Sequence, residues 1–204
     1  MIRKPSGREV FLAQLKPYML EDELEHVHAA YVFAKYGHRA QVRQGGDRYF
    51  EHPKAVANIL IRELSVRDDW QLIVTALLHD LLEDSWLLSE DRVRRNFGRR
   101  VAWWVKLLTK EAGPDYFERL RKAPWQPILV KFCDRLHNLR TLDACEACAL
   151  RLGQLAPVAA AEFRATASRG RVSLARHQEP DDSIEVVRPL TNKPWGARQT
   201  HAEQ

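Results

Sequence analysis

Apolar side chains recur at helical spacing along most of the first 145 residues of this chain. In segment 22–36 this spacing accompanies Asp22, an expected N-cap, and further acidic residues near the positive end of the helix dipole. Segment 38–51 breaks the pattern with two adjacent glycines and mixed charge, which predicts a loop. Strands do not alternate with helices, so the sequence predicts an all-α fold. The expected helices cover 22–36, 54–64, 72–84, 89–97, 99–110, 115–122 and 128–142.

The periodic pattern weakens after Cys148. Residues 156–176 are rich in alanine and arginine and are compatible with a further helix. Residues 178–204 contain three prolines and no apolar periodicity, which predicts a flexible tail. We therefore expect one domain over residues 1–177, long enough to bury a core without disulfides, followed by the tail 178–204.

The composition is that of an ordinary globular protein, with 45% hydrophobic and 29% charged residues. No apolar run approaches the roughly 18 residues of a membrane span, and the N-terminus lacks the apolar stretch of a signal peptide. Three cysteines are too few for a secreted disulfide framework, so we expect a cytoplasmic protein. The net charge is +5, and the five acids and three bases of the tail leave +7 on residues 1–177. A basic body attracts anions.

Segment 72–84, LIVTALLHDLLED, combines burial with charge. Apolar residues cover nearly all sides of this expected helix, which indicates that it is buried. A helical wheel places its polar residues on one arc: His79, Asp80, Glu83 and Asp84. Buried carboxylates beside an imidazole lose hydration and repel one another unless they are paired or bound to a metal. Two interpretations stay open, namely an exposed helix end or a site for a divalent cation.

Segment 128–142 shows an apolar face opposite a polar stripe. Asp134, Asn138 and Thr141 form the stripe at intervals of four and three residues. It is either a solvated surface or the wall of a wet cleft opposite the buried helix. The expected apolar face consists of Ile128, Leu129, Phe132, Leu136 and Leu139.

A second histidine completes a possible ligand set. His52 precedes Pro53, which places it at a helix start with its ring able to project from the helix end. Two imidazoles and two carboxylates suit Mn²⁺, Fe²⁺, Zn²⁺ or Mg²⁺ and require no thiolate. The candidate ligands are His52, His79, Asp80 and Asp134.

The order H…HD…D of these residues resembles that of the HD superfamily of metal-dependent phosphohydrolases. Three longer blocks, VRQGGDRYFEHP, LLHDLLED and LVKFCDRLHNLRTL, resemble the hydrolase domain of RelA/SpoT enzymes. They are equally similar to the stand-alone small alarmone hydrolases, including the metazoan form. The likeness covers about residues 20–145.

This resemblance implies an all-α HD-domain helical bundle that uses Mn²⁺ to remove the 3′-pyrophosphate from ppGpp and pppGpp. It implies that Glu83 and Asp84 activate water, that Arg43 packs on the guanine, and that Asn138 and Thr141 line the nucleoside pocket. It assigns the metal to the four candidate ligands. Gln44 and Gly45 stand where the family commonly has a basic residue and a small hydroxyl residue, which predicts looser purine discrimination.

Other functions stay open at this point. A related hydrolase could act on another nucleotide, such as an adenosine alarmone, NADPH or a deoxynucleoside monophosphate. A zinc site at Cys145 and Cys148 is not favoured, because the chain offers one further cysteine and no second pair. We expect guanosine alarmones as partners and neither nucleic acid nor membrane. The sequence leaves a homo-oligomer or a toxin partner undecided.

Overall fold

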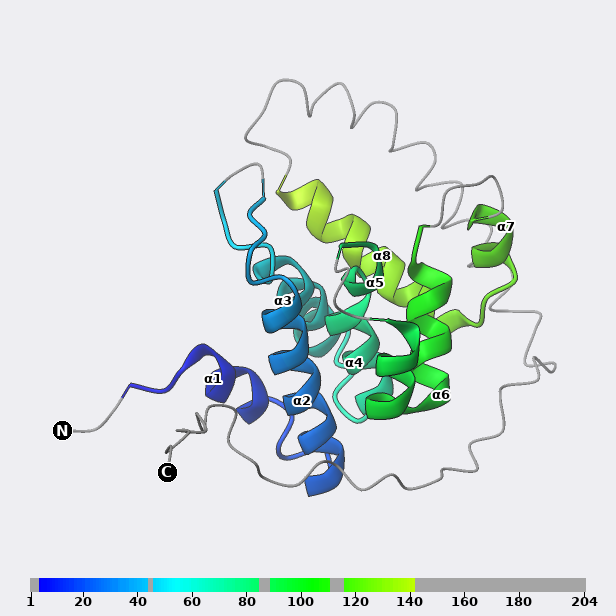
Figure 1. Ribbon diagram of the computed structural model, residues 1–204. Coiled ribbons are helices and arrows are strands. Elements are labelled where there is room, and N and C mark those ends of the chain that lie inside the picture. Colours follow the sequence, from blue (N-terminus) through cyan, green and yellow to red (C-terminus); the bar gives the residue numbers. More distant parts are fainter. Residues whose placement is uncertain (1–3, 44–45, 85–88, 111–115, 142–204) are drawn as a thin grey trace, which may run out of the picture.

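The computed structural model describes residues 4–43, 46–84, 89–110 and 116–141, with the side chain of Asp84 outside the description. Within these ranges the regular elements are helices (Figure 1), which confirms the all-α prediction. They are α1 Gly7–Ala13, α2 Glu21–Gly37, α3 Glu51–Asn58, the π-helix η1 Ile59–Glu63, α4 Trp70–Leu78, α5 Leu81–Asp84, α6 Glu90–Leu108, α7 Tyr116–Arg121 and α8 Trp125–Arg140. The expected tail, the segment 156–176 and residues 44–45, 145 and 148 lie outside the described residues.

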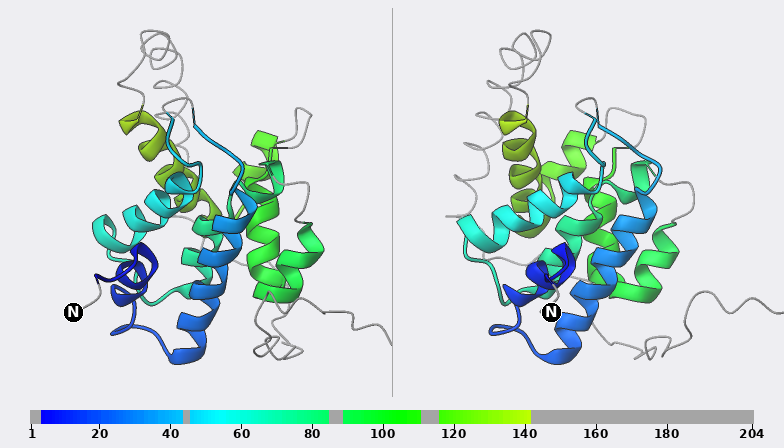
Figure 2. Two further views of the ribbon diagram at one scale, coloured as in Figure 1. Left: turned by 60° about the vertical axis from the view of Figure 1, so that its left-hand side comes forward. Right: turned by 90° about the vertical axis from the view of Figure 1, so that its left-hand side faces the viewer.

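Helix α4 is the centre of the bundle. Each of its residues from Leu72 to Leu78 is buried. Helices α2, α3, α6 and α8 all contact it, and α8 extends toward one end of the bundle in each view (Figures 1 and 2). None of the described helices has the length and apolar character needed to cross a membrane. The largely apolar surface of α4 is thus covered by the helices that surround it.

Capping residues set where several helices begin. The sequence offers Asp68 or Asp69 as the cap of the helix that follows. The Asp69 carboxylate accepts a hydrogen bond from the Leu72 amide at 2.9 Å, which confirms the second of the two as the cap of α4. The expected cap of α2 at Asp22 is wrong. That helix begins after Leu20, whose amide donates to the Glu23 carboxylate at 2.8 Å. The Glu23 carboxylate thus caps the amide that precedes the helix, and the helix begins at Glu21, so that Asp22 lies inside the first turn.

A kink divides α6 where the sequence predicts two helices. Gly98 has φ 86° and ψ 170°, a conformation that a side chain would strain. The residues before and after it are helical, so the predicted segments 89–97 and 99–110 meet at this glycine.

The continuous helix predicted over 72–84 is wrong. Helix α4 ends at Leu78, a turn follows at His79 and Asp80, and α5 begins at Leu81. In an unbroken helix neighbouring side chains diverge by about 100°. The turn removes that constraint, and the side chains of His79 and Asp80 both reach the same place, close to His52.

The predicted apolar face of α8 is only partly right. Ile128 and Leu129 are partly buried against the core, but Leu136 is 37% exposed. The fully buried residues of this helix are Pro127, Val130, Lys131, Cys133 and Asp134. Lys131 and Asp134 lie on the buried face, and in the sequence their charges make this face look polar and exposed. They are tolerated inside because the Lys131 ammonium and the Asp134 carboxylate pair at 2.8 Å.

Candidate metal centre

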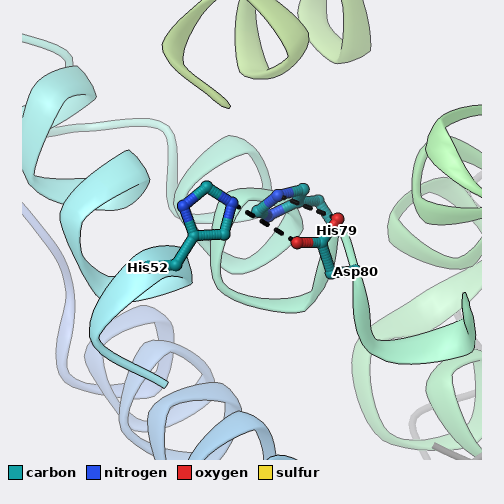
Figure 3. A group of neighbouring side chains, drawn as sticks. All are labelled: His52, His79 and Asp80. Atoms are coloured by element: carbon teal, nitrogen blue, oxygen red, sulfur yellow. Dashed lines mark ion pairs between the residues drawn. The ribbon is translucent and has the colours of Figure 1, made fainter. Parts of the chain in front are cut away.

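The four candidate ligands converge at the end of α4. His52 comes from the first turn of α3, His79 and Asp80 from the turn after α4 (Figure 3), and Asp134 from α8. One ligand atom from each of His52, His79 and Asp80 lies within 4.8 Å of the other two. Asp134 Oδ1 lies 3.2 Å from His52 Nε2 and 3.9 Å from His79 Nε2. Of the polar stripe of α8, Asp134 is buried and faces the end of α4, Asn138 is partly buried, and Thr141 is exposed.

Local structure explains how segments distant in sequence meet here. Pro53 occupies the first turn of α3, where its missing amide hydrogen costs no helical hydrogen bond. The His52 amide donates to the Tyr49 carbonyl at 2.9 Å, which anchors the helix start to the preceding loop. The Arg140 guanidinium at the end of α8 binds both oxygens of Glu63 in η1, at 2.6 Å and 2.8 Å. This bidentate pair joins α8 to the end of the α3–η1 helix.

The donor set fits a divalent cation. His79 Nε2 is buried and hydrogen-bonds no group in the described part of the chain, although Asp80 Oδ1 lies 3.1 Å away. His52 Nε2 faces Asp80 Oδ2 at 3.4 Å. Two imidazole nitrogens and two carboxylates therefore point at one shared space without being fully satisfied by one another. This mixed nitrogen and oxygen set suits the first-row divalent metals and Mg²⁺.

The electrostatics of the cluster favour a cation between the carboxylates. Burial alone would lower the pKa of His79, but Asp80 and Asp134 outweigh it and raise that pKa to about 9. Burial would raise the pKa of Asp80, yet His79 and His52 hold it well below its ordinary range. The pKa of Asp134 is lowered against burial by His52, His79 and Lys131. The carboxylates thus stay ionised and retain a proton on His79 that a metal would replace.

Three of the candidate ligands have a further partner on the side away from the shared space. His79 Nδ1 lies 2.9 Å from the Ala76 carbonyl oxygen, and the Tyr49 hydroxyl donates to Asp80 Oδ2 at 3.0 Å. His52 Nδ1 lies 2.8 Å from the Nδ1 atom of His137. Outer partners of this kind orient metal ligands and fix the tautomer of ligating histidines.

Sequence reasoning missed three of these partners: Tyr49, Lys131 and His137. Each carries a signal that could have found it. Lys131 and His137 stand three residues before and after Asp134, on the same helical face, and Tyr49 stands three residues before His52. Burial and the nearby His52 and Arg43 lower the pKa of His137 to about 4, so its ring is neutral at physiological pH.

The acidic pair after the turn is partly described. Glu83 lies in α5, and its carboxylate accepts a hydrogen bond from the Lys110 backbone amide at 2.5 Å. Partial desolvation and the neighbouring Asp80 raise the pKa of Glu83, against the lowering effect of Lys110. Asp84 closes the same helix, and its side chain lies outside the description.

The residues expected around the nucleoside lie along one edge of this cluster. Arg43 Nη2 donates to Asn138 Oδ1 at 2.7 Å, and Asn138 Nδ2 donates to Asp134 Oδ1 at 2.5 Å. Arg43 also lies with its guanidinium carbon 5.9 Å from the centre of the Tyr49 ring. Thr141 is exposed at the end of α8, where its hydroxyl donates to the carbonyls of His137 and Asn138 at 3.0 Å and 3.2 Å.

Comparison with known proteins shows related sequences of named activity. The chain is 34% identical over 143 residues to the bifunctional (p)ppGpp synthase/hydrolase SpoT of Escherichia coli, covering 64% of this chain and 20% of that protein. It is 36% identical over 140 residues to a guanosine-3′,5′-bis(diphosphate) 3′-pyrophosphohydrolase of Vibrio cholerae, covering 62% of this chain and 19% of the relative. The chain thus spans about a fifth of the length of these relatives.

A solved structure described as a metazoan ortholog of SpoT that hydrolyses ppGpp superposes with a TM-score of 0.49 at 27% identity. The superposition covers 69% of this chain and 73% of the other. The family model of the HD domain matches residues 30–156, which include all four candidate ligands. The chain therefore belongs to the HD domain family.

Proposed function

We propose that this protein is a metal-dependent hydrolase, with Mn²⁺ as the expected cation, that removes the 3′-pyrophosphate from guanosine alarmones. The products from ppGpp are GDP and pyrophosphate, and pppGpp gives GTP. One observation carries the proposal: ligand atoms of His52, His79 and Asp80 lie within 4.8 Å of one another, with Asp134 3.2 Å from His52, in a member of the HD domain family. Relatives named as guanosine-3′,5′-bis(diphosphate) 3′-pyrophosphohydrolases support the substrate class.

The four ligands would hold the cation. When bound there, it would lower the pKa of water toward neutrality and neutralise charge on a phosphoryl oxygen. Lys131 binds Asp134 Oδ2, while Oδ1, which also accepts from Asn138, lies toward His52. The Tyr49 hydroxyl donates to Asp80 Oδ2 in a similar way, and Asp80 Oδ1 lies toward His79. These contacts hold the carboxylates in one orientation before a substrate arrives.

Glu83 is suited to receive the proton of the attacking water. Its raised pKa lies closer to the operating pH than that of an ordinary glutamate, which favours proton transfer in both directions. The Lys110 amide fixes one carboxylate oxygen and leaves the other available. The water oxygen bonds to the phosphorus on the 3′ oxygen, the bond from that phosphorus to the 3′ oxygen breaks, and the 3′ oxygen takes up a proton. We assign Asp84 to the same acidic pair.

Arg43 provides the purine contact in this scheme. A planar guanidinium stacks on an aromatic base, and Arg43 already lies beside an aromatic ring at the rim of the cluster. Asn138 joins Arg43 to Asp134, so a purine at Arg43 would lie one side chain away from the metal ligands. Thr141, one turn further along, would border the ribose. The basic body, with +7 on residues 1–177, accommodates two or three 5′-phosphates.

A product analysis tests the proposal. Purified full-length protein with Mn²⁺ is incubated separately with ppGpp, pppGpp, ppApp, NADPH and deoxynucleoside monophosphates, and the products are separated by ion exchange. We expect GDP with pyrophosphate from ppGpp, and some turnover of ppApp because Gln44 and Gly45 replace the usual neighbours of Arg43. Orthophosphate as the first product from ppGpp would reject 3′-pyrophosphate removal. Turnover of a deoxynucleoside monophosphate with no turnover of either alarmone would assign the site to that nucleotide.

The role of Glu83 is tested by substitution. Glu83→Gln should lower turnover by roughly 10²-fold, the size of a general acid–base contribution, while metal content stays unchanged. Glu118→Gln in α7 is the matched control, because that glutamate is exposed and pairs with Arg121. Asp84→Asn should also lower turnover with metal retained. Full activity in both acidic variants would move water activation to another group.

A further inference from the structure

The two candidate ligand histidines have different partners for the nitrogen that faces away from the metal site. His79 Nδ1 faces the Ala76 carbonyl oxygen at 2.9 Å, a group that accepts hydrogen bonds and never donates. His52 Nδ1 faces another imidazole nitrogen, His137 Nδ1, at 2.8 Å. The tautomer of His79 is therefore fixed by the backbone, whereas that of His52 depends on a side chain.

Proton counting leaves two directions for the His52–His137 hydrogen bond. Two ring nitrogens at 2.8 Å form a hydrogen bond only if one carries a proton and the other a lone pair. If His52 donates from Nδ1, its Nε2 atom can present a lone pair toward Asp80 and Asp134, and a cation bound there would take that lone pair. If His137 donates, neutral His52 carries its proton on Nε2, 3.2 Å from Asp134 Oδ1 and 3.4 Å from Asp80 Oδ2.

The two arrangements differ in what the cluster can bind. A proton on His52 Nε2 satisfies the two carboxylates and fills the place of a cation. A lone pair on that atom supplies a ligand. We propose that His137 is a positioning residue that accepts the Nδ1 proton of His52, so that Nε2 stays open toward a divalent cation. His137 reaches the metal only through His52, and this role rests on the metal site of the proposed function but not on the nucleotide specificity.

The surroundings of His137 fit an acceptor. Its ring lies 4.9 Å from the His52 ring between centroids, tilted by 46°, and is partly buried. It stands on the helix that provides Asp134, one turn further along, so α8 supplies one ligand and the partner of another. The bidentate pair between Arg140 and Glu63 holds the same end of α8 against η1. The acceptor is thus placed by the helix rather than by a mobile loop.

Substitutions that differ in acceptor capacity test the proposal. His137→Gln keeps an acceptor oxygen, His137→Leu removes it at similar volume, and His26→Leu is the control. His26 is also a partly exposed histidine, but it stacks on Trp70 at 4.6 Å and lies in α2, outside the metal cluster. Mn²⁺ affinity of each full-length protein is measured by chelator competition without nucleotide.

We expect His137→Leu to weaken Mn²⁺ binding by roughly 10–100-fold, the usual effect of losing an outer partner. His137→Gln should stay within about threefold of the parent, and His26→Leu should match the parent. Equal losses in His137→Leu and His137→Gln would show a purely structural role and overturn the proposal. So would unchanged affinity in His137→Leu, or a parent protein that binds no divalent cation.

Nitrogen NMR on the Zn²⁺-loaded parent gives a second readout. The expected spectrum shows the proton on His52 Nδ1 and a scalar coupling across the hydrogen bond to an unprotonated His137 Nδ1. A proton on His137 Nδ1 instead would overturn the proposal. Metal binding that follows acceptor capacity in a protein inactive on alarmones would retain this role for His137 and reject the proposed substrate.

Discussion

The metal cluster and the outer face of α6 both bring acidic and basic side chains together. In the cluster, the side chains of His52, Asp80 and Asp134 are 1%, 15% and 6% exposed. On α6, Asp91 pairs with Arg94 and Arg95, and these side chains are 42–70% exposed. The residue chemistry is similar in both regions, and burial is what separates them.

This difference decides what each group of charges can do. Water solvates the charges on α6 whether or not they pair, so the pairs contribute little to stability. In the cluster each charge has lost its water and depends on its protein partners, so removing one partner leaves a buried charge unsatisfied. Burial therefore makes the cluster sensitive to single substitutions, and it would strengthen the attraction of the carboxylates for a cation bound as proposed.

The largest expected effect is that of removing a buried carboxylate. Asp80→Ala should abolish near-stoichiometric metal binding and lower turnover by about 10³-fold or more, because a catalytic cation contributes several kcal/mol. Metal analysis of protein purified without chelator measures the first effect. Asp91→Ala on α6 is the matched control and should retain both metal and turnover. Parental metal content in Asp80→Ala would refute the ligand assignment.

The sequence predicts the local features of the fold better than the contacts between distant segments. Helix positions are predictable because caps and breaks act locally, as with Asp69 and with Gly98. The side chains that come together at the end of α4 were named from the order of three short motifs. The partners Lys131 and His137 were not named, since their positions depend on which face of α8 turns inward. The partner Tyr49 was not named, since its contact with Asp80 joins a loop to a distant turn.

The turn at His79 and Asp80 shows the limit in physical terms. Leucine-rich segments on both sides favour one continuous helix, and nothing local signals a break. The break is stabilised by long-range contacts of the polar pair, such as the Tyr49 hydroxyl on Asp80 and the carboxylate of Asp134 near His79. The buried face of α8 is hard to predict for a similar reason. Lys131 and Asp134 look like surface residues in the sequence, but they pair with each other on the buried face.

Removing the buried lysine should cost stability. In metal-free protein, Lys131→Met leaves Asp134 without its ammonium partner, and breaking such a buried pair costs about 3 kcal/mol. Urea denaturation of metal-free protein measures the free energy of unfolding. Lys131→Arg should recover part of the loss, and Lys106→Met, which breaks a pair with Glu90 on α6, is the exposed control. A loss below about 1 kcal/mol for Lys131→Met would contradict the comparison.

Metal binding should also displace a proton from the cluster. The pKa of His79 is raised to about 9, so at pH 7.5 its ring is protonated in the metal-free protein and must lose that proton to become a ligand. Apparent metal affinity should then rise by about tenfold per pH unit below pH 9 and level off above it. Calorimetry in buffers of different ionisation enthalpy counts the released protons. Release of none at pH 7.5 would mean that the carboxylates do not hold a proton on His79.

The smallest effect is expected on α6. Arg95→Gln removes one of the two arginines that pair with Asp91, and Arg94 remains 2.7 Å away. Because Arg95 is 70% exposed, water replaces the lost contact, and the free energy of unfolding should change by about 0.5 kcal/mol or less. Metal affinity should equal that of the parent, and raising the salt concentration should shrink the remaining difference by screening. If Arg95→Gln destabilised the protein as much as Lys131→Met, burial could not be what separates the two regions, and a long-range role for the α6 charges would have to be sought.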